Sequence, residues 1–147
     1  PPDATRQLTY RMILREVPEA TQGRDNIQVT IALALSLPVF ITPPLAKRAV
    51  DCRGTPGDPG NLNVACSTIG SAYGQIREIL VREGERLIGR FEGGPYILPG
   101  AEKVLPIKLE RFGPADAPLS KVQLAVTFDD GTTQTYRVGA EAPPSGR

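Results

Sequence analysis

The run Ile27–Thr42 constrains this chain more than any other feature. Apolar side chains occupy every second position in it: Ile27, Val29, Ile31, Leu33, Leu35, Leu37, Val39 and Ile41. Alternation with a period of two is typical of a β-strand with one apolar face. At about 3.3 Å per residue the run spans roughly 50 Å, whereas strands usually have about five or six residues. A small domain cannot cover such a strand throughout. We therefore expect part of it to project or to lie on an edge, as an aggregation hazard or a binding device.

Composition indicates an all-β protein with many turns. The 147 residues include 15 Gly and 15 Pro but no His or Trp, and no long stretch has helical spacing. The net charge of +1 provides no general basic field for nucleic acid or for an anionic membrane. The apolar stretch Ile31–Ile41 is interrupted by Ser36 and Pro38 and is too short for a transmembrane helix. We therefore expect no nucleic-acid partner and no membrane insertion.

Short alternating segments follow the Pro43-Pro44 pair in quick succession. The expected strands are Ala46–Arg53, Leu62–Ser67, Gln75–Arg82, Arg86–Phe91, Tyr96–Leu98, Lys103–Arg111, Lys121–Phe128 and Thr132–Val138. About eight short strands in about 100 residues is the pattern of an immunoglobulin-like sandwich. We therefore predict that residues 44–147 form an immunoglobulin-like β-sandwich.

Residues 1–43 contain only two expected strands. Leu8–Val17 and Ile27–Thr42 flank a polar loop, and Pro43-Pro44 marks a domain boundary. Two strands cannot form a stable domain alone. Residues 1–43 are therefore predicted to be the last β-hairpin of a truncated first immunoglobulin-like domain. Exposed apolar strand edges tend to pair with the strands of another chain. We therefore expect this hairpin to self-associate with a second copy.

The segment around Asp130-Gly131 allows the pairing of two strands to be predicted. A two-residue turn would place Leu124 opposite Arg137, whereas a three-residue loop places Leu124 opposite Tyr136 and Val122 opposite Val138. The second register puts apolar residues on one face, and register follows the buried face. We therefore expect the three-residue loop, with Gly131 in a left-handed bulge position.

Cys52 and Cys66 flank a turn-rich segment. A turn centred near Pro59 would place them opposite each other across an antiparallel pair, near the separation that a disulfide needs. The alternative is two unrelated buried thiols. A disulfide would indicate an oxidising compartment such as the periplasm or the cell exterior.

The residue types that catalysis and metal binding need are scarce. Without histidine, no Ser-His-Asp hydrolase is possible, and two cysteines alone make a four-ligand zinc site very improbable. Asp129 and Asp130 resemble a carboxylate pair but, beside Gly131, are turn formers. We therefore expect neither an enzyme nor a cofactor or metal site.

Three segments resemble the periplasmic chaperones of bacterial chaperone–usher pili. Tyr10–Pro18 (YRMILREVP) is similar to the penultimate strand of that family's first domain, and Ile27–Pro44 is similar to its last strand. Asn61–Gly100, with GQIREILV and PYILPG, is similar to part of the second domain. The family's first five or so strands have no counterpart here.

The resemblance implies a function and its residues. Family members lend a long edge strand to pilus subunits that lack their own last strand, and an outer-membrane usher receives the subunits. By register, the donated residues would be Val29, Ile31 and Leu33, flanked by Ile27 and Leu35. The resemblance thus implies pilus subunits and an usher as partners, in the periplasm.

One position departs from the family. Many members use a basic residue to bind the subunit's terminal carboxylate, and the lysine of the last strand falls here at Pro38. We therefore nominate no anchor residue. The competing function is a structural or adhesive β-sandwich subunit of a bacterial surface structure, although Pro1–Gln7 is too short and too polar to be a subunit's donor arm.

Overall fold

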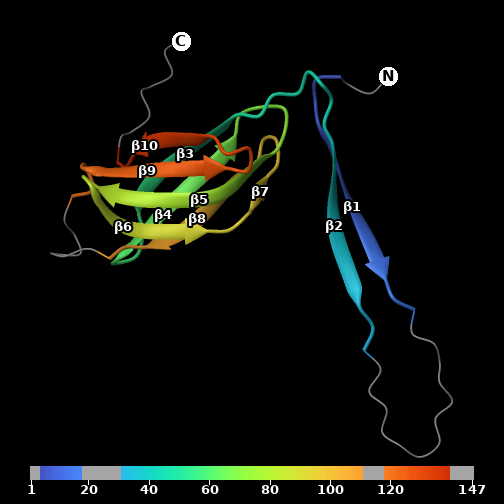
Figure 1. Cartoon of the computed structure of the whole chain (residues 1–147), viewed down its shortest axis with the longest axis horizontal. Helices are drawn as coiled ribbons and strands as arrows, with labels where there is room; N and C mark the ends of the chain where they lie inside the picture. The colour runs from blue at the N-terminus through green and yellow to red at the C-terminus, as the bar shows by residue number, and fades with distance from the viewer. Residues whose placement is uncertain (1–3, 18–30, 111–117, 140–147) are drawn as a thin grey trace, which may run out of the picture.

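The described part of the chain consists of β-strands without helices (Figure 1). A computed structural model describes residues 4–17, 31–110 and 118–139. The strands are β1 (Leu8–Arg15), β2 (Ala34–Ile41), β3 (Val50–Pro56), β4 (Asn61–Thr68), β5 (Gly74–Glu83), β6 (Arg86–Glu92), β7 (Tyr96–Ile97), β8 (Glu102–Lys108), β9 (Val122–Phe128) and β10 (Thr133–Arg137).

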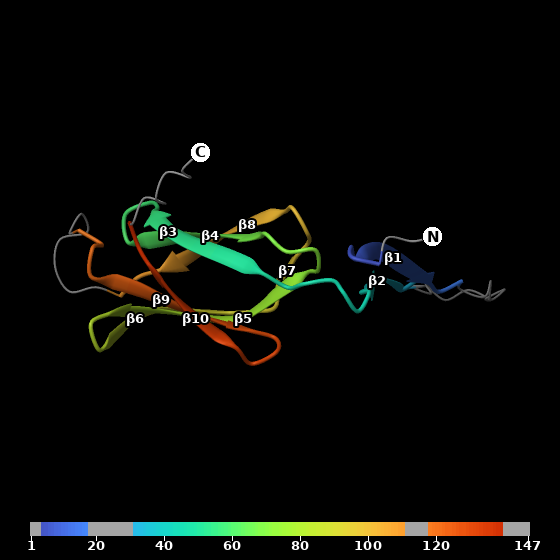
Figure 2. The same ribbon diagram turned by 90° about the horizontal axis from the view of Figure 1, so that it is seen from above.

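Strands β3 to β10 form two sheets that face each other (Figure 2). One sheet has the order β10-β9-β5-β6, with the short β7 paired to the start of β5, and the other has the order β3-β4-β8. All of these pairings are antiparallel. The all-β prediction is confirmed, and the two sheets agree with an immunoglobulin-like sandwich.

Alternate side chains of the two sheets fill the space between them. Along β4, every second residue from Leu62 to Thr68 is buried, and β9 buries Val122, Leu124, Val126 and Phe128 in the same manner. In β8, Leu105 and Ile107 point inward while Val104 is exposed. This period-two alternation is the pattern from which the strands were predicted.

The hairpin of β9 and β10 has the register predicted from its apolar residues. Leu124 pairs with Tyr136, and the backbone of Phe128 bonds to that of Thr132. Gly131 donates its N–H to the carbonyl of Phe128 and has a φ of 83°. The three-residue loop therefore ends in the left-handed glycine that the sequence required.

Cys52 and Cys66 lie opposite each other on β3 and β4 and form a disulfide with an S–S distance of 2.05 Å. Both cysteines are buried in the core between the sheets. The predicted pairing is confirmed, and the alternative of two unrelated thiols is wrong.

The start of β3 differs from the prediction. The strand begins at Val50 rather than Ala46, because the residues before it bond to a loop instead of to a strand. The carbonyl of Lys47 accepts the N–H groups of Ser71 and Ala72, and the carbonyl of Ala49 accepts that of Ile69. The segment after Pro43-Pro44 is thus tied to the loop between β4 and β5.

Strands β1 and β2 form a separate two-stranded ribbon (Figure 1). The ribbon leaves the end of the sandwich that carries the β4–β5 loop and runs away from the two sheets, so that its far end lies free of them. Strand β1 ends at Arg15 rather than at the predicted Val17.

Candidate functional site

The pairing of β1 with β2 sorts the ribbon's side chains into two faces. The strands are antiparallel, and the ladder runs from Leu8 opposite Ile41 to Arg15 opposite Ala34. Residues that are directly paired share a face of the ribbon, and successive residues alternate between the faces. The register therefore decides which side chains stand together.

One face of the ribbon carries only apolar side chains, and we call it the apolar face. It consists of Leu8, Tyr10, Met12, Leu14, Leu35, Leu37, Val39 and Ile41. Their exposed fractions lie between 36% and 55%, although side chains of this kind are normally buried in a sandwich. No described residue of the sandwich covers them as a second layer.

The opposite face has mixed chemistry, and we call it the mixed face. It consists of Thr9, Arg11, Ile13, Arg15, Ala34, Ser36, Pro38 and Phe40. Near the sandwich, the ring of Phe40 stacks on that of Tyr73, with 4.3 Å between the centroids. Pro38, the position at which the family resemblance expects a lysine, is paired with Arg11.

The far end of the candidate donor strand is not paired as a strand in the described residues. Ile31 is 80% exposed and Leu33 is 56% exposed, and both precede the first residue of β2. The backbone N–H of Glu16 donates to the carbonyl of Leu33 over 2.8 Å, while the N–H of Leu33 donates to Oε2 of Glu16 over 3.3 Å. The side-chain carboxylate of Glu16 thus accepts the backbone N–H of Leu33, which could otherwise donate to a neighbouring strand.

The predicted strand Ile27–Thr42 is therefore longer than the observed one. The ladder ends with Ala34 opposite Arg15, because at the next pair the N–H of Leu33 donates to the side chain of Glu16 instead of to its backbone carbonyl. Leu35 lies within β2, opposite Leu14, and is 47% exposed. Ile27 and Val29 lie outside the described residues. Of the five candidate donor residues, the structure thus describes Ile31, Leu33 and Leu35, all of them exposed.

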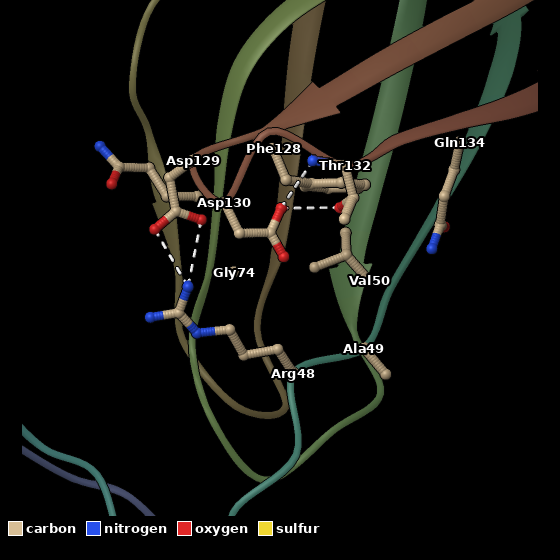
Figure 3. A pocket seen from close by; sticks show the side chains of 10 residues that line it. Arg48, Ala49, Val50, Gly74, Phe128, Asp129, Asp130, Thr132 and Gln134 are labelled. Atoms are coloured by element: carbon tan, nitrogen blue, oxygen red, sulfur yellow. Dashed lines mark hydrogen bonds and ion pairs between the residues drawn. The ribbon is translucent and has the colours of Figure 1, made fainter.

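A small pocket at the joint end of the sandwich is a weaker candidate (Figure 3). Its volume is about 60 Å³, whereas ligand pockets usually measure about 300–1,000 Å³. Its charged side chains are already paired, since Arg48 bonds to Asp129 at 3.1 Å. The hydroxyl and the backbone N–H of Thr132 donate to Asp130 and lower the pKa of that carboxyl. The polar side chains of this pocket therefore bond to one another and hold the β9–β10 loop in place, and they leave little for a ligand to bind.

Neither a cluster of metal ligands nor a membrane-spanning helix is present among the described residues. They contain no group of three or more potential metal ligands. None of their segments forms a helix that is long and apolar enough to cross a bilayer.

Sequence reasoning missed the contacts that hold the ribbon at the sandwich. Phe40, Tyr73 and Tyr96 are far apart in the chain, yet their rings meet at the joint. Gln7 is buried there. No periodicity or motif marks these residues. The only signal in the sequence is that aromatic residues are few, so that each of them is a candidate for a specific contact.

Comparison with known proteins gives no further indication of function. No protein-family model matches the chain, and no curated protein matches its sequence.

Proposed function

We propose that this chain is a periplasmic chaperone of the chaperone–usher type. It binds pilus subunits by donating the exposed strand around Ile31, Leu33 and Leu35, and it delivers them to an outer-membrane usher for assembly. The observation that carries the proposal is the far end of the ribbon, where alternate apolar side chains are exposed and the backbone runs away from the sandwich (Figure 1). The resemblance of Tyr10–Pro18 and Ile27–Pro44 to the last two strands of that family's first domain supports it.

The physical basis is β-augmentation. A subunit that lacks a strand offers an open sheet edge and an apolar groove, and the donated strand supplies both backbone bonds and alternate side chains. Burying one such aliphatic side chain contributes roughly 1.5–3 kcal/mol before the costs of association. Ile31, Leu33 and Leu35 together therefore contribute a substantial interface. Their spacing at every second residue determines how they fit the subunit's groove.

The disulfide supports the proposed compartment. Cys52 and Cys66 are bonded within the sandwich, and structural disulfides form and persist in oxidising compartments such as the bacterial periplasm.

Charge substitutions on alternate residues test the proposal. We expect Ile31→Asp or Leu33→Asp to abolish capture of a co-expressed pilus subunit, because a carboxylate cannot be solvated in an apolar groove. Ala32→Asp is the matched control: it adds the same charge between the two positions, where a donated strand turns its side chain away from the groove. Capture is measured by co-purification of the subunit with the chain.

The far-UV circular dichroism of each variant should stay unchanged, because the substitutions lie outside the sandwich. Undiminished co-purification with Ile31→Asp and Leu33→Asp would remove the donor-strand assignment. Equal loss with Ala32→Asp would show that charge, rather than the alternation, decides binding.

A further inference from the structure

Gln7 is buried at the joint between the ribbon and the sandwich. It is 5% exposed, although it directly precedes the exposed strand β1. Its Oε1 accepts hydrogen bonds from the backbone N–H of Tyr73 at 3.0 Å and from the hydroxyl of Thr42 at 3.1 Å. Its Nε2 donates to Oγ1 of Thr9 at 3.1 Å, and its backbone N–H donates to the carbonyl of Ser71 at 3.0 Å.

These bonds connect three segments that are distant in sequence. Thr9 belongs to β1, Thr42 follows β2, and Ser71 and Tyr73 belong to the loop between β4 and β5. A buried amide that loses its partners pays the desolvation penalty of its polar atoms. The side chain of Gln7 is therefore best satisfied in one arrangement of ribbon and sandwich.

An aromatic cluster supports the same arrangement. Phe40 stacks on Tyr73 with an interplanar angle of 21°, and Tyr96 completes the cluster at centroid distances of 5.1 and 5.6 Å. The guanidinium of Arg48 lies 4.4 Å from the centroid of the Tyr73 ring and also donates to its hydroxyl at 2.9 Å. Arg48 is held in turn by Asp129.

We infer that Gln7 is a positioning residue that fixes the ribbon at one angle to the sandwich. With the stack of Phe40 on Tyr73, it makes the joint rigid, so that the donor strand is presented in a constant direction. The link between this rigidity and subunit capture rests on the proposed function, whereas the rigidity itself does not. The bonds of Gln7 join neutral groups and are therefore not screened by salt, unlike the ion pair of Arg48 with Asp129.

A rigid joint has a quantitative consequence for binding. If a partner contacts both the ribbon and the sandwich, it can bind only those copies of the chain in which the angle between ribbon and sandwich fits both contacts. The apparent dissociation constant then rises in inverse proportion to the competent fraction. A variant that lowers this fraction to about one tenth should bind about tenfold more weakly, although Ile31 and Leu33 are unchanged.

Spin-label distance measurements test the inference directly. The chain's own cysteines are bonded to each other, so labels can be attached at Ser36→Cys on the ribbon and Glu85→Cys on the sandwich. Both positions are exposed. An excess of unlabelled chain removes distances between copies. We expect one narrow distance distribution that is the same at low and high salt.

Gln7→Ala should broaden this distribution, and Thr42→Val, which removes a single hydroxyl at nearly constant shape, should broaden it less. Gln123→Ala, which changes an exposed glutamine of β9, is the matched control and should leave the distribution narrow. The thermal transition of the sandwich shows whether each variant is folded.

A distribution that is already broad in the parent chain would overturn the inference, and so would an unchanged narrow one in folded Gln7→Ala. Capture of subunits is then measured separately. If the distribution broadens while no variant, including the parent, captures a subunit, the joint stands and the proposed function fails. If capture is normal in the parent and unaffected by a broadened joint, the rigidity has no role in donation.

Discussion

At the scale of single residues, Tyr136 connects the two sheets through its hydroxyl. The hydroxyl donates to the carbonyl of Val50 at 3.0 Å and contacts the amide oxygen of Gln134. Burial of the ring, with a smaller contribution from the charge of Asp51, raises the pKa of Tyr136 to about 12. The folded state therefore favours the neutral phenol more strongly than the unfolded state does.

This preference predicts a loss of stability in alkaline solution. The folded-state pKa exceeds the ordinary value of about 10, so the stabilisation is fully present below pH 10 and is lost between about pH 10 and pH 12. Tyr136→Phe should lower stability by about 1 kcal/mol at pH 7 through the lost hydrogen bond, and it should flatten the decline above pH 10. Urea unfolding across this pH range measures both effects. An equally steep decline in Tyr136→Phe would contradict this account.

At the scale of elements, the close approach of β3 to the end of β10 closes one side of the sandwich. Gly54 of β3 forms a parallel bridge with Val138. A Cβ atom at Gly54 would lie 2.8 Å from Cγ2 of Val138 and 3.3 Å from Cδ1 of Leu124. Valine has a stiff side chain, so the contact can be relieved only by moving the strands apart.

Gly54→Ala should therefore destabilise the sandwich by about 1–3 kcal/mol, as is usual for overpacking. The control is Arg53→Ala on the same strand, which removes an exposed ion pair with Glu102 and should cost less than about 1 kcal/mol. Denaturant midpoints compare the two variants. A Gly54→Ala protein as stable as the parent would show that the strands have room to separate.

At the scale of the whole molecule, the apolar face of the ribbon predicts self-association. Packing two copies face to face would bury sixteen half-exposed side chains, which yields on the order of 10–20 kcal/mol. Association costs about 4–15 kcal/mol. The gain exceeds the cost over most of these two ranges, so we expect a dimer in which Arg11 and Arg15 on the mixed faces stay in solvent.

Sedimentation equilibrium at tens of micromolar tests this prediction. The parent chain should be dimeric, and Leu37→Lys on the apolar face should shift it to the monomer. Ser36→Lys adds the same charge on the mixed face and should leave the dimer intact. A monomeric parent chain would refute self-association through this face.

The sequence alone determined which segments form the strands of the sandwich, apart from the start of β3, and also the register of β9 with β10 and the disulfide. Each depends on local chemistry: alternation marks a strand with a buried face, Gly131 specifies one loop, and a single turn places Cys52 opposite Cys66. These patterns carry their information within a few residues, so no knowledge of distant contacts was needed.

Only the tertiary structure decided where the predicted strand Ile27–Thr42 stops pairing and what holds the ribbon in place. The run Ile27–Thr42 alternates without a break, but β2 starts at Ala34 because the N–H of Leu33 bonds to the side chain of Glu16 and not to its backbone. Likewise, nothing near Gln7 in the sequence indicates that Thr42 and Tyr73 satisfy its amide. Such features depend on groups that folding brings together from distant positions, and a pattern within one segment cannot encode which distant segment will meet it.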